Sequence, residues 1–175
     1  MNILITGVHG FVGSNLVKYL AKENTIYGLD IVQPQKDGVK CTYSWDALDV
    51  EGVIPKIDAI IHLAGKAHDT RNKSEADVYF RVNTGLTKKI FDWYMASESA
   101  RKFIFFSTAK AAAECVPNIL LEDVIPTPKG PYGESKIKAE EYILTSLESQ
   151  GVYRGSMSST VPVSDRPKNG KEVYI

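Results

Sequence analysis

Two side chains late in the chain, Tyr132 and Lys136, have types and a spacing that could carry out proton transfer. Four residues apart, they share one face if the segment is helical. An unperturbed tyrosine is a poor base at neutral pH, but a nearby ammonium stabilises its phenolate form. A phenolate held in this way can accept a proton from a hydroxyl group. Taken alone, such a pair is usually ordinary helix surface, so its interpretation depends on the rest of the sequence.

A glycine-rich turn near the start of the chain, TGVHGFVG, indicates where a phosphate group would bind. The turn follows an apolar run typical of a strand and opens a helical pattern. Glycine permits a tight turn and lets a phosphate approach the backbone without a Cβ in the way. The helix that follows offers free N–H groups and the positive end of its dipole. A tight turn without a ligand is the alternative. We expect the pyrophosphate of NAD or NADP to lie against Gly7, Gly10, Phe11, Val12 and Gly13.

An aspartate at the end of the second apolar run favours NAD over NADP. Asp30 ends the segment YGLD and is followed by Ile31. A carboxylate there can accept hydrogen bonds from the adenosine ribose and would repel a 2′-phosphate. An aspartate that caps a turn is the alternative. Further along, Asp46 could contact the adenine amino group, with Asp49 as a competing candidate, and either could be simple surface charge.

These residues would be positioned by apolar runs that alternate with helical patterns. Near-continuous apolar strands between helices predict a parallel sheet covered on both faces. With a glycine turn after the first strand, this is a doubly wound Rossmann fold of the α/β class. We expect it to occupy residues 1–150, followed at 151–175 by an irregular segment with the possible start of a sixth strand. The predicted strands are 2–6, 25–30, 39–45, 58–64 and 102–107, and the predicted helices are 11–23, 75–97 and 131–148.

Five motifs in sequence order resemble the extended short-chain dehydrogenase/reductase family, in its NAD-dependent nucleotide-sugar epimerase/dehydratase branch. They are TGVHGFVG, YGLD, IIHLAGKAH, FIFFSTAK and PYGESK, and they span about the first 150 residues. The resemblance implies that Tyr132 takes a proton from a sugar hydroxyl while hydride passes to NAD, and that Lys136 also holds the nicotinamide ribose. It also implies that Thr108, rather than Ser107, hydrogen-bonds the reacting sugar oxygen. A strand-end hydroxyl that satisfies backbone groups is the alternative for Thr108.

The resemblance implies further cofactor contacts at the fourth strand and the helix after it. Leu63, Ala64 and Gly65 would lie beside the cofactor, where small residues allow close approach. Asn83 matches a family asparagine on the nicotinamide side, with a helix-surface amide as the alternative. Lys66 and Arg71 could face an anionic diphosphate, although loop charges are usually just solvated.

Two departures from the family pattern follow the threonine. The 4,6-dehydratases carry an Asp-Glu pair where this chain has Ala109 and Lys110, so it lacks the acid and base of elimination chemistry. Many epimerases read Val-Tyr-Gly where this chain has Ala111, Ala112 and Ala113. The second departure concerns the shape of the substrate pocket and does not affect the residues implied in hydride transfer.

The resemblance makes a nucleotide-sugar 4-epimerase-like enzyme, acting through a transient 4-keto sugar, the leading function. Its substrate would be UDP-linked. A 4-ketosugar reductase of the same family and a non-catalytic NAD-binding module remain as alternatives. The family normally continues well beyond this length, so we expect a C-terminally truncated chain without the substrate domain and of uncertain activity. The helices over 75–97 and 131–148 pack between subunits in the family, which implies a homodimer.

Composition excludes some classes of protein. Acidic and basic residues balance at 21 each, which argues against nucleic-acid binding driven by bulk charge. No apolar run is long enough to cross a bilayer, and the chain opens on a strand pattern rather than a secretory signal. The spacings of Cys41 and Cys115, and of His62 and His68, match no metal site. We therefore expect no metal, no membrane contact and a cytoplasmic protein with reduced thiols.

Overall fold

The computed structural model describes residues 1–66, 75–113, 125–149 and 170–175 of the chain. His68, Arg71, Cys115 and the segment 151–169, all singled out from the sequence, lie outside the described residues. The chain divides into two compact units. The first contains Met1–Ala64 and Asp92–Phe106, and the second contains Gly65–Phe91 and Ser107–Ile175.

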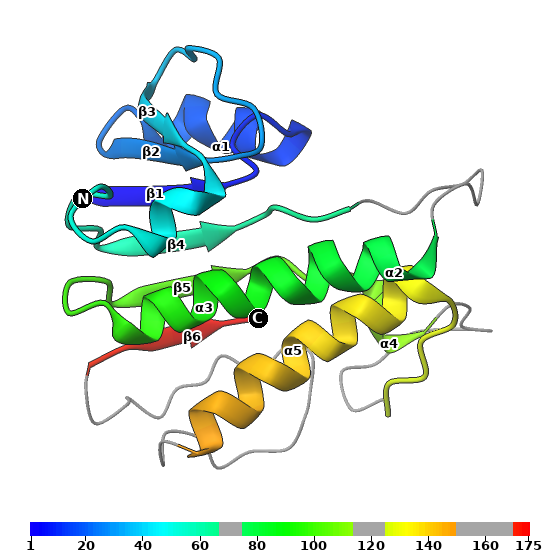
Figure 1. The fold of residues 1–175 in the computed structure, drawn as a ribbon. Helices are drawn as coiled ribbons and strands as arrows, with labels where there is room; N and C mark the ends of the chain where they lie inside the picture. The colour runs from blue at the N-terminus through cyan, green and yellow to red at the C-terminus, as the bar shows by residue number, and fades with distance from the viewer. Residues whose placement is uncertain (67–74, 114–124, 150–169) are drawn as a thin grey trace. The chain divides into compact units, whose positions relative to one another are not determined.

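Parallel strands form the sheet of the first unit, which Figure 1 shows as the arrows β1 to β5. They are hydrogen-bonded in the order β3-β2-β1-β4-β5, and each printed neighbour pair is parallel. The strand order therefore reverses between β1 and β4, the point at which doubly wound sheets bind ligands. This arrangement confirms the predicted α/β Rossmann fold. The strands are β1 (Asn2–Thr6), β2 (Thr25–Leu29), β3 (Val39–Tyr43), β4 (Ala59–His62) and β5 (Lys102–Phe105).

Apolar side chains explain why the central strands form. β1 and β4 are buried along almost their whole length, as expected for parallel strands covered on both faces. Helix α1 (Phe11–Leu20) contributes Val17 to a buried cluster, with Leu16 and Leu20 packed against its edge. Complete burial of one such side chain stabilises a fold by about 1.5–3 kcal/mol. The buried members of the cluster are Ile3, Ile5, Val8, Val17, Ile26, Ala59 and Ile61.

Helices dominate the described part of the second unit. Helix α5 (Pro131–Ser149) contacts α2 (Ala76–Tyr79), the π-helical turn η2 (Phe80–Gly85) and the short α4 (Ala109–Ala112). Figure 1 shows α5 running beside the helix that contains α2. Helix α3 (Leu86–Ala96) continues η2, and its residues from Asp92 onward belong to the first unit. The unit also contains the short strand β6 (Glu172–Tyr174).

The structure differs from the predicted elements mainly at their ends. Strand β1 has the predicted bounds, whereas β2, β3, β4 and β5 each end before the predicted residue. The predicted helix over 75–97 contains the π-helical turn η2, which a 3.6-residue period cannot reveal. Neither α4 nor the 3₁₀ turn η1 (Trp45–Asp49) was predicted. Across the described residues, no helix has both the length and the apolar character needed to cross a membrane.

Candidate functional site

The glycine turn between β1 and α1 is closed by contacts that leave no room for side chains at two positions. Gly7 has a φ of +68°, in the left-handed region that favours glycine. A Cβ on Gly7 would lie 3.0 Å from the backbone nitrogen of Ala64. A Cβ on Gly13 would lie 2.5 Å from the carbonyl oxygen of Gly7. These two glycines are therefore needed by the turn itself, whatever it binds.

The first turn of α1 offers backbone donors for an anion. Gly10 is the residue before the helix and has no side chain with which to cap it. The helical ladder begins with Ser14, whose N–H donates to the carbonyl of Gly10 at 2.9 Å. The N–H groups of Phe11 and Val12 precede that bond, and their side chains are 86% and 43% exposed. An uncapped helix N-terminus of this kind fits the pyrophosphate of a dinucleotide.

Asp30 ties the glycine turn to the end of β2. Its Oδ2 accepts the N–H of His9 at 3.0 Å, and its Oδ1 accepts the N–H of Ile31 at 2.8 Å. The carboxylate thus caps a turn, as one interpretation of the sequence held. Each oxygen has a second lone pair, so ribose binding remains chemically open. The ribose contact itself stays a prediction.

A buried threonine and histidine join the carboxyl ends of β1 and β4. Thr6 Oγ1 lies 2.6 Å from Nδ1 of His62 and accepts the N–H groups of Leu63 and Ala64 at 3.1 and 3.0 Å. A hydroxyl has two lone pairs and one proton. Since both lone pairs receive N–H groups, the proton is donated to Nδ1, and His62 is assigned as neutral with its proton on Nε2. Thr6 therefore holds the backbone of two predicted cofactor contacts.

Tyr132 and Lys136 lie on successive turns of α5, on the shared helix that the sequence predicts. The ring of Tyr132 packs edge-on against Tyr79, with centroids 6.2 Å apart. Lys136 is only 8% exposed. Burial lowers the pKa of the Lys136 ammonium to about 8, and the charge of Glu140 opposes that shift. Lys136 therefore remains mainly charged at neutral pH and can stabilise a phenolate on its helix.

The hydroxyls of Ser107 and Thr108 differ in what they bind. Ser107 Oγ donates to Oε1 of the buried Glu140. Thr108 is the N-cap of α4, and its Oγ1 accepts the N–H of Lys110 at 3.3 Å. That bond leaves the Thr108 proton available for a substrate oxygen, whereas the Ser107 proton is committed inside the protein. The geometry agrees with the choice of Thr108, although its substrate contact stays a prediction.

Asn83 is a buried residue of η2 and is not a helix-surface amide. It is 1% exposed. Its Oδ1 accepts the N–H of Lys66 at 2.6 Å, and its Nδ2 donates to Lys66 O at 3.2 Å and to Ser135 Oγ at 2.9 Å. Ser135 in turn donates to the carbonyl of Tyr132 at 2.8 Å. Asn83 therefore links the backbone of Lys66 to the first turns of α5, and any cofactor contact is in addition to this role.

Several residues with contacts to distant segments could not be identified from the sequence patterns used above. Glu140 resembles one more charge on an amphipathic helix. Gly133 lies so close to the carbonyl of Lys110 that a Cβ would collide with it, and glycine thereby allows α4 to approach α5. Thr6 was part of an apolar strand pattern, and the only available signal was a hydroxyl at the last position of a buried strand.

The other residues predicted to contact the cofactor differ in their exposure and in the neighbours they contact. Asp46 and Asp49 are exposed in η1, so the adenine contact stays a prediction. Leu63 packs against the core cluster of the first unit. Gly65 is exposed, and a Cβ there would lie 2.9 Å from Oδ1 of Asn83. The ammonium of Lys66 lies 5.7 Å from the ring centre of Tyr79.

Known proteins resemble this chain in sequence and in fold. The chain is 28% identical over 165 residues to UDP-glucose 4-epimerase of Streptococcus mutans, covering 87% of this chain and 49% of that protein. It is 27% identical over 151 residues to GDP-6-deoxy-D-mannose reductase of Pseudomonas aeruginosa, covering 81% of this chain and 46% of that protein. Its fold matches the UDP-Glc/GlcNAc 4-epimerase of Campylobacter jejuni with a TM-score of 0.71 and 27% identity, covering 86% and 50% of the two chains.

The chain thus spans about half the length of the curated relatives it matches. The model of the family described as NAD dependent epimerase/dehydratase matches residues 3–171, nearly the whole chain. We conclude that this chain belongs to the NAD-dependent epimerase/dehydratase family.

Proposed function

We propose that the chain is the cofactor-binding part of a nucleotide-sugar 4-epimerase that binds NAD and acts on a UDP-linked sugar. One observation supports this most directly. The half-buried Tyr132 shares α5 with a lysine that is buried and still mainly charged at neutral pH. Such a pair suits reversible proton transfer at a hydroxyl carbon. The similarity to UDP-glucose 4-epimerase supports the choice of reaction.

The chemistry of the proposed reaction divides between the cofactor and the side chains. When bound, NAD supplies the hydride acceptor, which no side chain can provide. Tyr132, as phenolate, accepts the proton of the sugar 4-hydroxyl, and Lys136 favours the phenolate form. Thr108 donates a hydrogen bond to the same sugar oxygen. The 4-keto sugar then takes back hydride on its other face and a proton from Tyr132, so the reaction has no net oxidation.

Cofactor binding in this proposal rests on the turn and on Asp30. The uncapped N-terminus of α1 receives the pyrophosphate. The carboxylate of Asp30, fixed by two backbone N–H groups, faces the adenosine ribose and disfavours the 2′-phosphate of NADP. The proposal therefore includes NAD rather than NADP as the cofactor.

A reductase of 4-ketosugars is the second candidate. The similarity to GDP-6-deoxy-D-mannose reductase favours it, and it would use the same Tyr132, Lys136 and Thr108. The two candidates differ in the fate of the cofactor, because an epimerase regenerates bound NAD whereas a reductase releases its oxidised cofactor. A non-catalytic NAD-binding module is the third candidate, in which the chain would bind the cofactor and convert no sugar.

The proposed assembly and location are a homodimer in the cytoplasm. The family resemblance supports the dimer, because the two helices that pack between subunits in the family correspond to the continuous helix α2–η2–α3 and to α5. The exposed free thiol of Cys41 suits a reducing compartment. Light scattering at high protein concentration tests the dimer, and a monomer would contradict it.

Product analysis with UDP-sugars tests the proposed reaction. The chain and a version extended to the length of its relatives would each be incubated with NAD and UDP-glucose, UDP-galactose or their N-acetyl forms. We expect epimers from the extended version and little or none from the 175 residues alone. An extended protein that binds NAD and converts no sugar would favour the non-catalytic module. Robust epimer formation by the short chain would show that it encloses a sugar nucleotide unaided.

A further inference from the structure

Glu140 is a buried carboxylate one turn beyond Lys136 on α5. It is 5% exposed, less than Lys136 itself. A buried carboxylate is costly unless hydrogen bonds or opposite charges compensate it. The reaction proposed above gives Glu140 no task, so its burial calls for another explanation.

The partners of Glu140 belong to the two segments that carry the proposed catalytic residues. Its Oε1 accepts the hydroxyl of Ser107, the residue directly before Thr108. Its charge interacts with Lys136 on its own helix. Burial raises the pKa of Glu140, while the Ser107 hydrogen bond and the Lys136 charge both lower it. These contacts oppose burial, which has the larger effect, so the pKa of Glu140 is raised overall.

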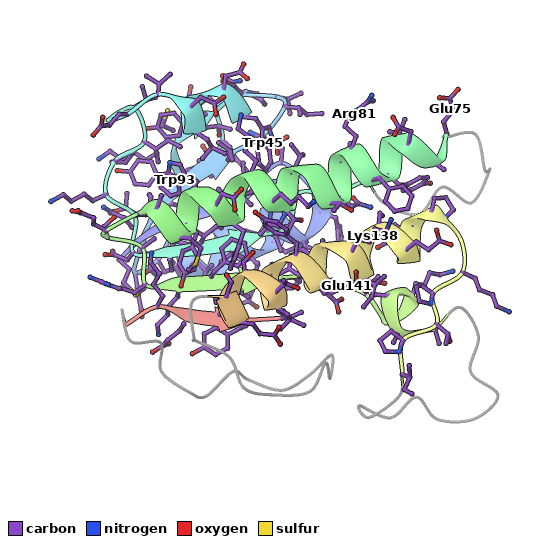
Figure 2. All side chains as sticks on the ribbon, turned by 60° about the horizontal axis from the view of Figure 1, so that its bottom comes forward. Trp45, Glu75, Arg81, Trp93, Lys138 and Glu141 are labelled. Atoms are coloured by element: carbon purple, nitrogen blue, oxygen red, sulfur yellow. The ribbon has the colours of Figure 1, made fainter. Side chains whose placement is uncertain are left out.

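The other charged side chains on α5 and on the elements packed against it have different interaction partners. Asp77 of α2 and Arg81 of η2 approach each other to 4.0 Å, with side chains 83% and 71% exposed. Figure 2 shows Arg81 on the side of its helix that faces away from α5. Lys138 on α5 lies over the ring of Phe80 at 4.8 Å. The carboxylate of Glu141 raises the pKa of Glu140.

Two further titratable side chains belong to α5 and to the short helix packed against it. Lys110 belongs to α4, and its backbone N–H is capped by Thr108. Tyr132 shares α5 with Lys136. Of all these groups, Glu140 is the one whose charge opposes the effect of burial on the pKa of Lys136.

We propose that Glu140 is a positioning residue of the site, which ties Ser107 to α5 and places a buried carboxylate one turn from Lys136 on the same helix. The hydrogen bond to Ser107 holds the start of α4, where Thr108 is the cap, in a fixed register with the helix of Tyr132. The negative charge keeps the ammonium of Lys136 protonated in its buried environment. The link to catalysis rests on the proposed function, whereas the effects on Ser107 and Lys136 do not require turnover.

Titration of Lys136 tests the charge effect directly. The protein would be labelled with ¹³C at lysine Cε, the Lys136 signal assigned by its loss in Lys136→Arg, and its chemical shift followed with pH. In Glu140→Gln we expect the pKa of Lys136 to fall by about one unit or more from its value of about 8. Glutamine has the same shape and can still accept the Ser107 hydroxyl. The control is Glu141→Gln, an exposed neighbour, which should leave Lys136 within about 0.3 units.

An unchanged Lys136 titration in folded Glu140→Gln would overturn the proposal. If that variant does not fold, Ser107→Ala provides the second measurement. Loss of the hydroxyl should raise the pKa of Glu140, followed through its side-chain carboxyl carbon, and should speed amide hydrogen exchange in α4. If Ser107→Ala changes neither the pKa of Glu140 nor the amide exchange rates in α4, the proposal is likewise overturned. Because neither measurement needs NAD or a sugar, failure of the proposed epimerase reaction would leave these outcomes interpretable.

Discussion

The hydroxyl of Thr6 donates its proton to Nδ1 of His62 across 2.6 Å, deep in the sheet of the first unit. The same oxygen receives the N–H groups of the two residues after His62. One side chain therefore fixes both a histidine tautomer and the course of the backbone at the carboxyl end of β4.

Replacing Thr6 with valine should destabilise the protein by about 1–3 kcal/mol, because buried donors lose their acceptor while the side-chain shape is kept. Urea denaturation measures the change. Thr6→Ser, which retains the hydroxyl, is the matched control and should recover most of the stability. Full stability in Thr6→Val together with a loss in Thr6→Ser would mean that packing of the methyl group, rather than hydrogen bonding, carries the effect.

The His62 tautomer can be observed directly. We expect ¹⁵N chemical shifts of a neutral ring with the proton on Nε2, because Nδ1 accepts the Thr6 hydroxyl. In Thr6→Val this constraint disappears, and the ring should populate a mixture of forms. A wild-type spectrum with the proton on Nδ1 would contradict the assigned direction of the hydrogen bond.

Two substitutions in the glycine turn should distinguish a loss of stability from a loss of cofactor binding. Gly13→Ala should cost about 1–3 kcal/mol in stability, since its Cβ would lie 2.5 Å from Gly7 O and 2.9 Å from the Val8 Cα, both backbone atoms. A Cβ at Gly10 would meet only Gly7 O, at 3.2 Å. Gly10→Ala should therefore keep its stability within about 1 kcal/mol. If Gly10 approaches the pyrophosphate, calorimetry of this folded variant should show much weaker NAD binding.

Asp30 should control the choice of cofactor. The wild type is expected to bind NAD more tightly than NADP. Asp30→Asn should reduce the difference between the two affinities, because the charge that repels a 2′-phosphate is removed. Calorimetric titration of both cofactors provides the measurement, with the exposed Asp46→Asn as control. Tighter binding of NADP by the wild type would overturn this prediction.

Turnover in a version extended to the length of its relatives should depend on three side chains. Tyr132→Phe should lose about 10²–10⁴-fold in rate while NAD binding persists, because only the proton acceptor is removed. Lys136→Ala should be at least as damaging. Thr108→Ser should be mild and Thr108→Val severe, since the reaction needs only the hydroxyl. A Tyr132→Phe enzyme with nearly full activity would refute the assigned base.

The buried Lys136 should leave a signature in the pH dependence of stability. Its pKa is about 8 in the folded protein, below the ordinary lysine value of 10.5, so the unfolded chain binds more protons between these values. The Lys136 contribution to the free energy of unfolding should therefore rise with pH across that window, by about 3 kcal/mol in total. Tyrosines also titrate in this range. Subtracting the pH profile of the unfolding free energy of Lys136→Met from that of the wild type therefore isolates the Lys136 contribution. An identical slope in the two proteins would show that Lys136 titrates normally when folded.

Sequence patterns predicted those parts of the fold and the site that depend on local order along the chain. The apolar run of β1, the glycine turn after it and the Tyr132–Lys136 helix are all local features, and the structure contains each. The strand ends were less predictable, because a parallel ladder stops where its neighbour stops rather than where the apolar run does.

The unpredicted parts of the site depend on contacts between distant segments. Glu140 occurs in a polar helical pattern, and only the folded chain brings it into contact with Ser107, 33 residues away. Thr6 and His62 are 56 residues apart and meet because β1 and β4 are neighbours. Asn83 was identified through the family resemblance, yet its hydrogen bonds to Lys66 and Ser135 follow only from the folded helix arrangement.

The π-helical turn η2 has a consequence for how this chain tolerates insertions and deletions. A π turn is equivalent to an α-helix with one residue inserted, so the segments before and after it are out of phase by about 100°. Deleting one residue within Phe80–Gly85 could restore a continuous helix, but it would rotate Tyr79 on α2 relative to α3. The edge-on contact of Tyr79 with Tyr132 would then be lost without any change to either side chain. A relative with a single-residue gap at this point in an alignment would therefore lack the aromatic contact that Tyr79 makes with Tyr132.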